Sequence, residues 1–276
     1  MGHNGPVVRT FTKRYAGSGP GHPRLEAASL AWLAEAEASG GARIAKVVAV
    51  TDATLTLEHL PNQAPAPGAA EALGRALAKT HAAGASHFGA PPPGWQGSGS
   101  IGLAPLTFVD AVPSADPWGT FYASERLAPY VALAAKRRAL PADGPAVYAK
   151  LDQRLRGGLF DVPQPALAPP VARIHGDLWS GNLLFGPPVA GEGWTGAVLI
   201  DPATHGGHAE TDLAMLALFG APSLGRIIAA YHETSPLASD WPDRVALHQL
   251  HPLLVHACLF GGSYGRQAVD LARRYL

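Results

Sequence analysis

The stretch RIHGDLWSGNLLF, residues 173–185, carries the densest set of reactive side chains in this chain of 276 residues. It places His175, Asp177, Ser180 and Asn182 in one short segment between two apolar runs. Two glycines interrupt the segment, which is typical of a loop. The stretch therefore predicts a catalytic or ligand-binding loop, and the question is which of its side chains acts.

The composition indicates a globular protein without a strongly charged surface. Hydrophobic residues make up 47% of the chain and charged residues 15%, which fits a folded protein with an ample core. The 21 basic and 21 acidic residues cancel, so we expect no nucleic-acid or membrane partner. The single cysteine, the absence of a signal-peptide pattern and the absence of an apolar run of about 20 residues favour a cytoplasmic location.

The pattern of apolar and turn-forming residues predicts an α+β fold with two lobes around a cleft. The smaller lobe, residues 1–62, is expected to hold a helix at 24–41 and strands at 7–14, 43–50 and 54–60. The larger lobe, residues 63–276, is expected to begin with a helix at 69–84 and a loop-rich part at 84–118. From about residue 119 it is mainly helical, with expected helices at 119–139, 145–157, 209–219, 222–233, 241–258 and 262–275 and short strands at 171–175 and 197–201.

Ser180 does not fit the pattern of a nucleophilic serine. A nucleophile elbow follows G-x-S-x-G, with small residues two positions before and after the serine. Leu178 and Asn182 take those positions here. We therefore do not expect a serine hydrolase.

A metal-dependent hydrolase that uses His205, His208 and Asp201 is a further alternative. Two histidines on one helix face can bind zinc, but Gly206 and Gly207 between them disfavour a helix, and no H-E-x-x-H motif is present. The more ordinary interpretation is that these histidines shape a loop.

Asp177, Asn182 and Asp201 together have the pattern that phosphoryl transfer requires. One aspartate accepts the proton of an attacking hydroxyl, while an asparagine and a second aspartate supply oxygen ligands to Mg²⁺. The two flanking strands, 171–175 and 197–201, are expected to form a hairpin that points the three side chains into the cleft. Each residue could instead serve a turn, but their order between two strands favours the catalytic interpretation.

At these residues the chain resembles the fructosamine/ketosamine kinase family, within the aminoglycoside-phosphotransferase-like branch of the protein-kinase fold. The resemblance lies in HGDLWSGN at 175–182 and LIDPATHGGHAETDLAMLALFG at 199–220, with weaker similarity in LEHL at 57–60 and LAKTHAAG at 77–84. It covers nearly the whole chain from about Val7. It implies a protein-kinase-like fold with a nucleotide-binding lobe at 1–62 and a catalytic and substrate lobe at 63–276.

The resemblance also implies a role for each site residue. Asp177 would be the general base, and Asn182 and Asp201 would hold Mg²⁺. Trp179 would stack against the sugar-like substrate, although a buried core aromatic is an equally ordinary role for a tryptophan. Four further residues of the loop and its neighbourhood would support the fold: His175 would organise the loop through backbone hydrogen bonds, and His208, Glu210 and Asp212 would give structural support.

The nucleotide site implied by the resemblance lies in the smaller lobe. Lys13 would pair with the ATP phosphates, and Glu26 on the first helix would hold Lys13, as kinases require. Glu58 to Leu60 would offer backbone groups to adenine. Surface charges on a strand and a helix are the ordinary alternative for Lys13 and Glu26.

The first residues depart from the family pattern. Kinases cover the ATP phosphates with a glycine-rich turn between two strands, and such a hairpin needs about five residues in each strand. Only 12 residues precede Lys13, and MGHNGP at 1–6 cannot form this hairpin. We therefore expect a small lobe that is truncated, that starts upstream, or that covers the phosphates in another way.

The sequence predicts an ATP-dependent kinase that phosphorylates a sugar hydroxyl of a small or protein-bound ketosamine, with a role in deglycation repair. Another small-molecule kinase of the same fold, acting on an aminoglycoside or a choline-like alcohol, is the close alternative. A degenerate kinase that binds ligand without turnover is the second. Whether the protein is a monomer or a dimer stays open.

Overall fold

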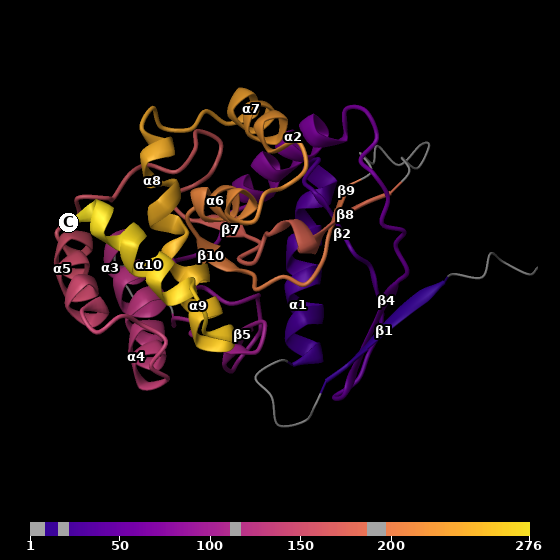
Figure 1. Ribbon diagram of the computed structural model, residues 1–276. Helices are drawn as coiled ribbons and strands as arrows, with labels where there is room; N and C mark the ends of the chain where they lie inside the picture. Colours follow the sequence, from indigo (N-terminus) through magenta and orange to yellow (C-terminus); the bar gives the residue numbers. More distant parts are fainter. Residues whose placement is uncertain (1–8, 16–21, 111–116, 187–196) are drawn as a thin grey trace, which may run out of the picture.

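The computed structural model describes residues 9–15, 22–110, 117–186 and 197–276 and has an α+β architecture. A small sheet and helix α1 (Pro23–Ala34) lie on one side, and most of the helices lie on the other (Figure 1). The predicted fold class is confirmed in this respect. Residues 1–8 lie outside the described residues, so the expected lack of a glycine-rich hairpin stays a prediction.

The small sheet places Lys13 directly across from a buried residue of the neighbouring strand. It has the antiparallel order β1 (Thr10–Arg14), β4 (Thr54–Glu58) and β3 (Val47–Val50). Lys13 pairs with Leu55, and Leu55 and Leu57 are buried. Because side chains alternate along a strand, Lys13 and Tyr15, two positions later, point to the same side of the chain.

The predicted strand 43–50 is wrong as a single element. It divides into β3 and β2 (Arg43–Ile44), and β2 pairs in parallel with β9 (Ala197–Leu199), which also pairs with β8 (Leu183–Phe185). The division has a physical reason: Ile44 and Ala45 are buried in the core, whereas Lys46 is exposed.

The predicted hairpin of strands 171–175 and 197–201 is also wrong. β7 (Ala172–Ile174) pairs with β10 (His205–Gly207), a strand that was expected to be a loop. β9 is unavailable to β7 because it lies between β2 and β8. Two short sheets, rather than one hairpin, therefore hold the two ends of the predicted catalytic loop.

The helical part agrees with the predicted helices in place but not always in continuity. The predicted helix 119–139 consists of α3 (Trp118–Phe121), a π-helical turn at Tyr122–Leu127 and α4 (Ala128–Lys136). The predicted helix 241–258 divides at Gln249, because Pro252 has no N–H for the carbonyl of His248. The remaining elements are α2 (Ala69–Ala82), β5 (Gly99–Ile101), β6 (Ala104–Leu106), α5 (Gly144–Arg156), α6 (Glu210–Leu218), α7 (Leu224–Thr234), α8 (Trp241–His248), α9 (Leu250–Phe260) and α10 (Tyr264–Ala272).

Two large hydrophobic cores lie among the described residues, beside a small cluster of Ala172, Ile174 and Ala209. One joins α1 and the small sheet to α2, the β8–β9 pair, α6 and α7, and the other lies among α3, α4, α5, α9 and α10. The first core extends across the predicted boundary at residues 62 and 63, because Leu33 and Leu55 share it with Leu77 and Leu199. In the described ranges, no helix combines the length and apolar character needed to cross a membrane.

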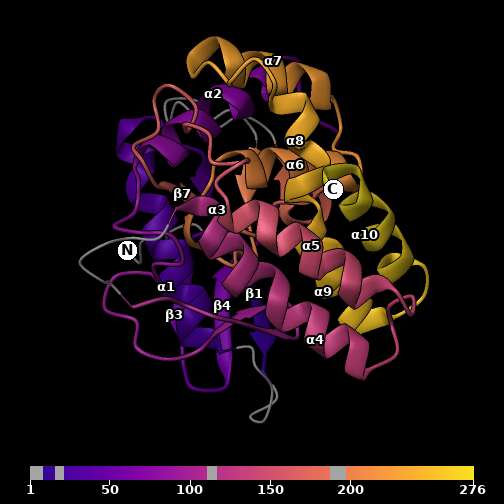
Figure 2. The same ribbon diagram turned by 90° about the vertical axis from the view of Figure 1, so that its left-hand side faces the viewer.

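Helices α2 and α7 lie side by side at the top of the molecule in both views (Figures 1 and 2). Gly74 of α2 makes this close approach possible. A Cβ at position 74 would lie 2.2 Å from the carbonyl oxygen of Ile227 in α7, which is far inside van der Waals contact. Gly225, in contrast, faces open space.

We expect Gly74→Ala to destabilise the protein by about 1–3 kcal/mol, because the two helices must separate to admit one methyl group. Gly225→Ala is the matched control and should be neutral or stabilise by roughly 0.5–1 kcal/mol, since alanine favours a helix. Thermal unfolding followed by circular dichroism measures both. Equal unfolding midpoints for Gly74→Ala and the unmodified protein would show that α2 and α7 do not pack this closely.

Candidate active site

The predicted loop begins with a tight backbone turn at Gly176. Its φ is +82°, and a Cβ there would lie 2.2 Å from the carbonyl oxygen of Ala203. Only glycine fits such a conformation without strain. The glycine of the HGD motif therefore brings the loop after β7 against the segment after β9.

Asp212 of α6 holds this turn from inside the protein. Its carboxylate accepts hydrogen bonds from the backbone N–H of His175 at 2.7 Å and of Gly176 at 2.9 Å, and it pairs with His81 Nε2 at 3.1 Å. His81 Nδ1 in turn hydrogen-bonds with the hydroxyl of Tyr231 at 2.8 Å. Burial alone would raise the pKa of Asp212, but these donors, His81 foremost, hold it below its ordinary value. Asp212 is therefore a buried anion that fixes the loop.

His175 organises the loop as the sequence predicted. Its Nε2 hydrogen-bonds with the carbonyl oxygen of Ile200 at 2.9 Å, which joins the loop to the end of β9. Burial lowers the pKa of His175, so the ring is neutral near pH 7. This bond brings Asp201, the next residue, close to Asp177.

Asn182 connects the two aspartates. Its amide nitrogen donates to the backbone carbonyl of Asp177 at 2.8 Å and to the Asp177 carboxylate at 3.2 Å. A longer contact of 3.4 Å reaches the carbonyl oxygen of Asp201. The structure therefore brings the three predicted residues together, and Asp201 takes a left-handed conformation with φ of +55°.

The carboxyl group of Asp177 has a pKa close to neutral pH. Burial raises its pKa to about 7, and the charges of Asp201 and Asp212 add to this, although the hydrogen bond from Asn182 opposes it. A carboxylate that binds and releases a proton near pH 7 suits a general base.

Lys13 reaches this group from the small sheet. Its ammonium contacts Glu26 at 2.8 Å and also forms an ion pair with Asp201. Burial would lower the pKa of Lys13, but the two carboxylates raise it above its ordinary value. Lys13 therefore remains charged and joins β1, α1 and the segment after β9.

Tyr15 is a site residue that the sequence reading missed. Its hydroxyl donates a hydrogen bond to the second carboxylate oxygen of Glu26, so Glu26 is held by Lys13 and Tyr15 together. The signal was present, since Tyr15 follows Lys13 by two positions and a strand alternates its faces.

Most of the predicted site residues line a cleft of about 710 Å³, the exceptions being Glu58 and Leu60. Trp179 lies in its wall with 39% of its surface exposed and packs edge-on against Phe219, so it is not a core aromatic. A Cβ at Gly181 would lie 2.2 Å from the indole, which explains the glycine after Ser180. The described lining includes Lys13, Tyr15, Glu26, Ser100, Leu103, Phe108, Asp177, Trp179, Asn182 and Asp201.

A second cavity of about 300 Å³ adjoins the first and shares Lys13 and Asp201 with it. Its walls are mainly apolar, and Glu58 and Leu60 both line it. The Glu58 carboxylate is engaged elsewhere, because it binds Arg43 at 2.8 and 3.0 Å and accepts the Lys46 N–H at 3.0 Å. The remaining apolar lining residues are Phe11, Ala45, Leu57, Leu184 and Ile200.

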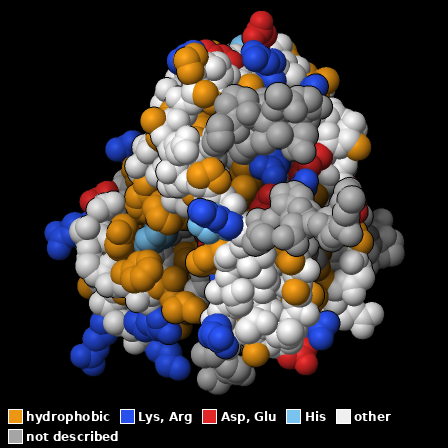
Figure 3. All heavy atoms as spheres, turned by 90° about the vertical axis from the view of Figure 1, so that its right-hand side faces the viewer, with side chains coloured by type: hydrophobic (Ala, Val, Ile, Leu, Met, Phe, Trp, Pro, Cys, Tyr) orange, Lys and Arg blue, Asp and Glu red, His pale blue; other side chains and the backbone are white. Residues whose placement is uncertain are grey.

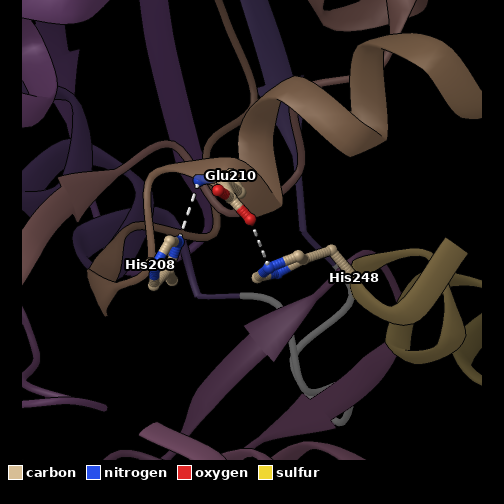
Figure 4. A group of neighbouring side chains, drawn as sticks. All are labelled: His208, Glu210 and His248. Carbon is tan, nitrogen blue, oxygen red and sulfur yellow. Dashed lines mark hydrogen bonds and ion pairs between the residues drawn. The ribbon is translucent and has the colours of Figure 1, made fainter. Parts of the chain in front are cut away.

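The structure does not assemble the alternative metal site of His205, His208 and Asp201. His205 hydrogen-bonds with the carbonyl oxygen of Ala203, and burial lowers its pKa to about 3. Among the described residues, one group has ligand atoms within 4.8 Å of one another, and it consists of His208, Glu210 and His248 (Figure 4).

That group is dominated by an ion pair. Arg244 donates to both carboxylate oxygens of Glu210, at 2.9 and 2.6 Å. The guanidinium therefore occupies the carboxylate that a metal ion would need, and a second positive charge beside it is unfavourable. This arrangement supports the expectation that His208 and Glu210 are structural.

The raised pKa of Asp177 predicts how stability depends on pH without Mg²⁺ or nucleotide. Because its pKa rises from 3.8 to about 7 on folding, the folded protein keeps a proton that the unfolded chain releases between these values. Stability then falls as pH rises through this window. Asparagine does not titrate, so Asp177→Asn removes this fall in the free energy of unfolding. We expect the variant to be more stable than the unmodified protein by about 1–3 kcal/mol at pH 8 but not at pH 4.

Urea unfolding of the unmodified protein and of Asp177→Asn across this pH range measures the difference in their free energies of unfolding. The contributions of the other titrating groups are the same in both proteins and cancel in this difference. Asp152→Asn, on the exposed face of α5, is the control and should show no pH-dependent difference of this size. A difference for Asp177→Asn that stays constant with pH would contradict the assigned pKa.

Comparison with known proteins agrees with this geometry. The fructosamine kinase family matches residues 10–276. A probable ketoamine kinase of Synechocystis is 37% identical over 207 residues, which are 74% of this chain and 61% of that protein. The chain thus matches less than two thirds of the length of this relative.

Solved structures give the same result. A candidate fructosamine-3-kinase from Thermobifida fusca has 42% identity and a TM-score of 0.82, over 97% of this chain and 85% of that one. A choline kinase of Streptococcus pneumoniae, with 12% identity and a TM-score of 0.54 over 98% of this chain and 86% of that one, shares the fold alone. Given the match over residues 10–276, the chain belongs to the fructosamine kinase family.

Proposed function

We propose that the protein is an ATP-dependent kinase that transfers a phosphoryl group to a sugar hydroxyl of a ketosamine. The observation that carries the proposal is the convergence of Asp177, Asn182 and Asp201 with the Lys13–Glu26 pair on one cleft. In such reactions, catalysis consists mainly of positioning and charge stabilisation. Each part of this cluster suits one of those tasks.

The 300 Å³ cavity suits the adenine of ATP. Its apolar walls offer a slot for a planar ring, and the backbone at Glu58 to Leu60 lies at its edge. Lys13 lies between this cavity and the larger cleft, so phosphates that extend from the adenine reach its ammonium. Glu26 and Tyr15 keep that ammonium in place.

Asn182 and Asp201 suit Mg²⁺, which prefers oxygen ligands. The Asp201 carboxylate already binds one cation in the form of Lys13, so positive charge is favourable at this point. When bound, Mg²⁺ neutralises the charge of the phosphates. The Asn182 side chain would contribute its amide oxygen while its nitrogen continues to orient Asp177.

Asp177 suits the role of the base. The hydroxyl oxygen of the sugar forms a bond to the γ-phosphorus, the bond to the bridging oxygen breaks, and ADP leaves. The hydroxyl proton passes to the Asp177 carboxylate, whose pKa of about 7 allows it to accept the proton near neutral pH. Asn182 holds one carboxylate oxygen and thereby aims the other.

Trp179 suits a sugar that stands beside the base. It is two residues from Asp177, half exposed, and lies in the wall of the same cleft. An aromatic face packs well against the C–H groups of a sugar ring. The 3-hydroxyl of a fructosyl amine as the acceptor, and a role in deglycation, are the finer parts of the proposal and rest on the family resemblance.

The kinase proposal is tested by ADP release with fructosyl-lysine, ATP and Mg²⁺. We expect Asp177→Ala to lower kcat by about 10²–10⁴-fold, because the proton has no acceptor. Asp152→Ala is the matched control and should keep full activity. Substrate-dependent ADP release that is unchanged in Asp177→Ala, or none from the folded unmodified protein, would contradict the proposal.

Tyr15→Phe tests the nucleotide site separately. Loss of the hydrogen bond to Glu26 loosens Lys13, so we expect KM for ATP to rise about 3–10-fold while KM for fructosyl-lysine stays unchanged. Tyr275→Phe, which loses a hydrogen bond to the carbonyl of Asp243 far from the cleft, is the control. A change in KM for fructosyl-lysine with no change in KM for ATP would contradict the placement of Tyr15 at the nucleotide site.

A further inference from the structure

Large apolar side chains gather at the mouth of the cleft beyond Trp179. Of the exposed large hydrophobic residues in the described ranges, Leu103, Trp179, Phe219 and Phe260 lie in this region, and Leu103 and Phe260 are 74% and 68% exposed. Exposed apolar side chains that stand alone need no explanation, but a contiguous group marks a binding surface.

These residues form a continuous surface that leads away from the site. Ring centres lie 6.0 Å apart between Trp179 and Phe219, 5.0 Å between Phe219 and His256, and 5.5 Å between His256 and Phe260. The turn between β5 and β6, which carries Leu103, reaches Leu259 of α9. We call Leu103, Trp179, Phe219, His256 and Phe260 the aromatic shelf. Figure 3 shows hydrophobic side chains gathered on the left of one face and bordering on Lys and Arg side chains below them.

A basic pocket of about 500 Å³ begins where the shelf ends. Gly261 and Gly262, directly after Phe260, line it together with Arg137, Arg138, Arg266, Arg273 and Asp270. Arg273 is already paired with Asp143 and Asp270. Arg138 and Arg266 are exposed, and no carboxylate of the described residues pairs with either. The pocket therefore has positive charge that remains available to an anionic ligand.

Phe219, His256 and Phe260 of the shelf lie outside the described lining of the cleft, and so does the basic pocket. The cleft itself provides the base and the tryptophan for the sugar. The aliphatic arm of a modified lysine would leave the cleft past Trp179 and bring its main chain onto the shelf. Extended polypeptide covers about 3.3 Å per residue, so at most about five residues span the three ring separations from Trp179 to Phe260, where the basic pocket begins.

We propose that the aromatic shelf and the basic pocket bind a polypeptide whose lysine carries the ketosamine, and that they select acidic residues about three to five positions from that lysine. This inference rests on the proposed function and adds a substrate preference to it. Arg138 and Arg266 bind the acidic side chains, and the shelf buries an apolar residue next to the modified lysine. Charge pairs at such an edge change affinity and depend on salt.

Three substrates test the preference: free fructosyl-lysine, a fructosyl-lysine peptide with Phe beside the lysine and Glu three to five positions away on either side, and the same peptide with Gln for Glu. For the unmodified protein we expect kcat/KM to be about 3–10-fold higher with the Glu peptide than with the Gln peptide. The advantage should shrink at high salt, because exposed charges are screened.

Arg266→Glu should abolish that advantage through KM and leave turnover of free fructosyl-lysine unchanged. A glutamate fits the first turn of α10, so the fold should tolerate it. Arg138→Asn is the second variant, because asparagine tolerates the left-handed conformation at position 138, where φ is +55°. Arg154→Glu, near the end of α5, is the control and should keep the preference. Phe260→Ala should raise KM for both peptides, whereas Leu159→Ala should not.

The outcomes separate the two proposals. Equal kcat/KM for the Glu and Gln peptides, with normal turnover of free fructosyl-lysine, would overturn the inference and leave the kinase proposal intact. No turnover of any of the three substrates by the unmodified protein would contradict the kinase proposal itself. A dimer in sedimentation that Phe260→Ala converts to monomers would also overturn the inference, since the shelf would then be the contact between two copies.

Discussion

The buried carboxylate of Asp212 is the contact on which the site depends. It receives two backbone N–H groups from the loop after β7 and one imidazole from α2, so a single charge joins the loop and α2 to α6. Such an anion is costly inside a protein unless donors surround it, and here they do. Because the turn it holds includes Gly176, the direction of the Asp177 side chain follows from a residue that lies outside the cleft.

Charge balance in the cleft explains how three carboxylates can lie near one another. Lys13 satisfies Glu26 and Asp201, while burial leaves Asp177 neutral for part of the time near pH 7. The arrangement keeps a cation beside Asp201 and a carboxyl group of raised pKa beside Asn182. In the proposed reaction, the cation would face the charge of the phosphates and the carboxyl group would face the proton of the hydroxyl.

The local features of the site could be predicted from the sequence, and the long-range ones could not. Spacing within HGDLWSGN and the aspartate after the next strand placed Asp177, Asn182 and Asp201 in one group, and their contacts agree. β2 and β10 have only two and three residues, so they carry no readable alternation. The glycines of β10 suggested a loop, yet Gly206 approaches the carbonyl of His87 so closely that a side chain could not fit. The partners of Tyr15 and Asp212 lie on other elements, which single-sequence patterns do not reveal.

The most direct test is a crystal structure with Mg²⁺, a non-hydrolysable ATP analogue and fructosyl-lysine. The account predicts adenine in the cavity lined by Leu57 and Leu184, Mg²⁺ on Asn182 and Asp201, and Lys13 on a phosphate while it still contacts Glu26. It also predicts a sugar hydroxyl about 2.6–3.2 Å from a carboxylate oxygen of Asp177. Nucleotide bound outside this cavity, or a metal ion held by His208, Glu210 and His248 instead, would contradict it.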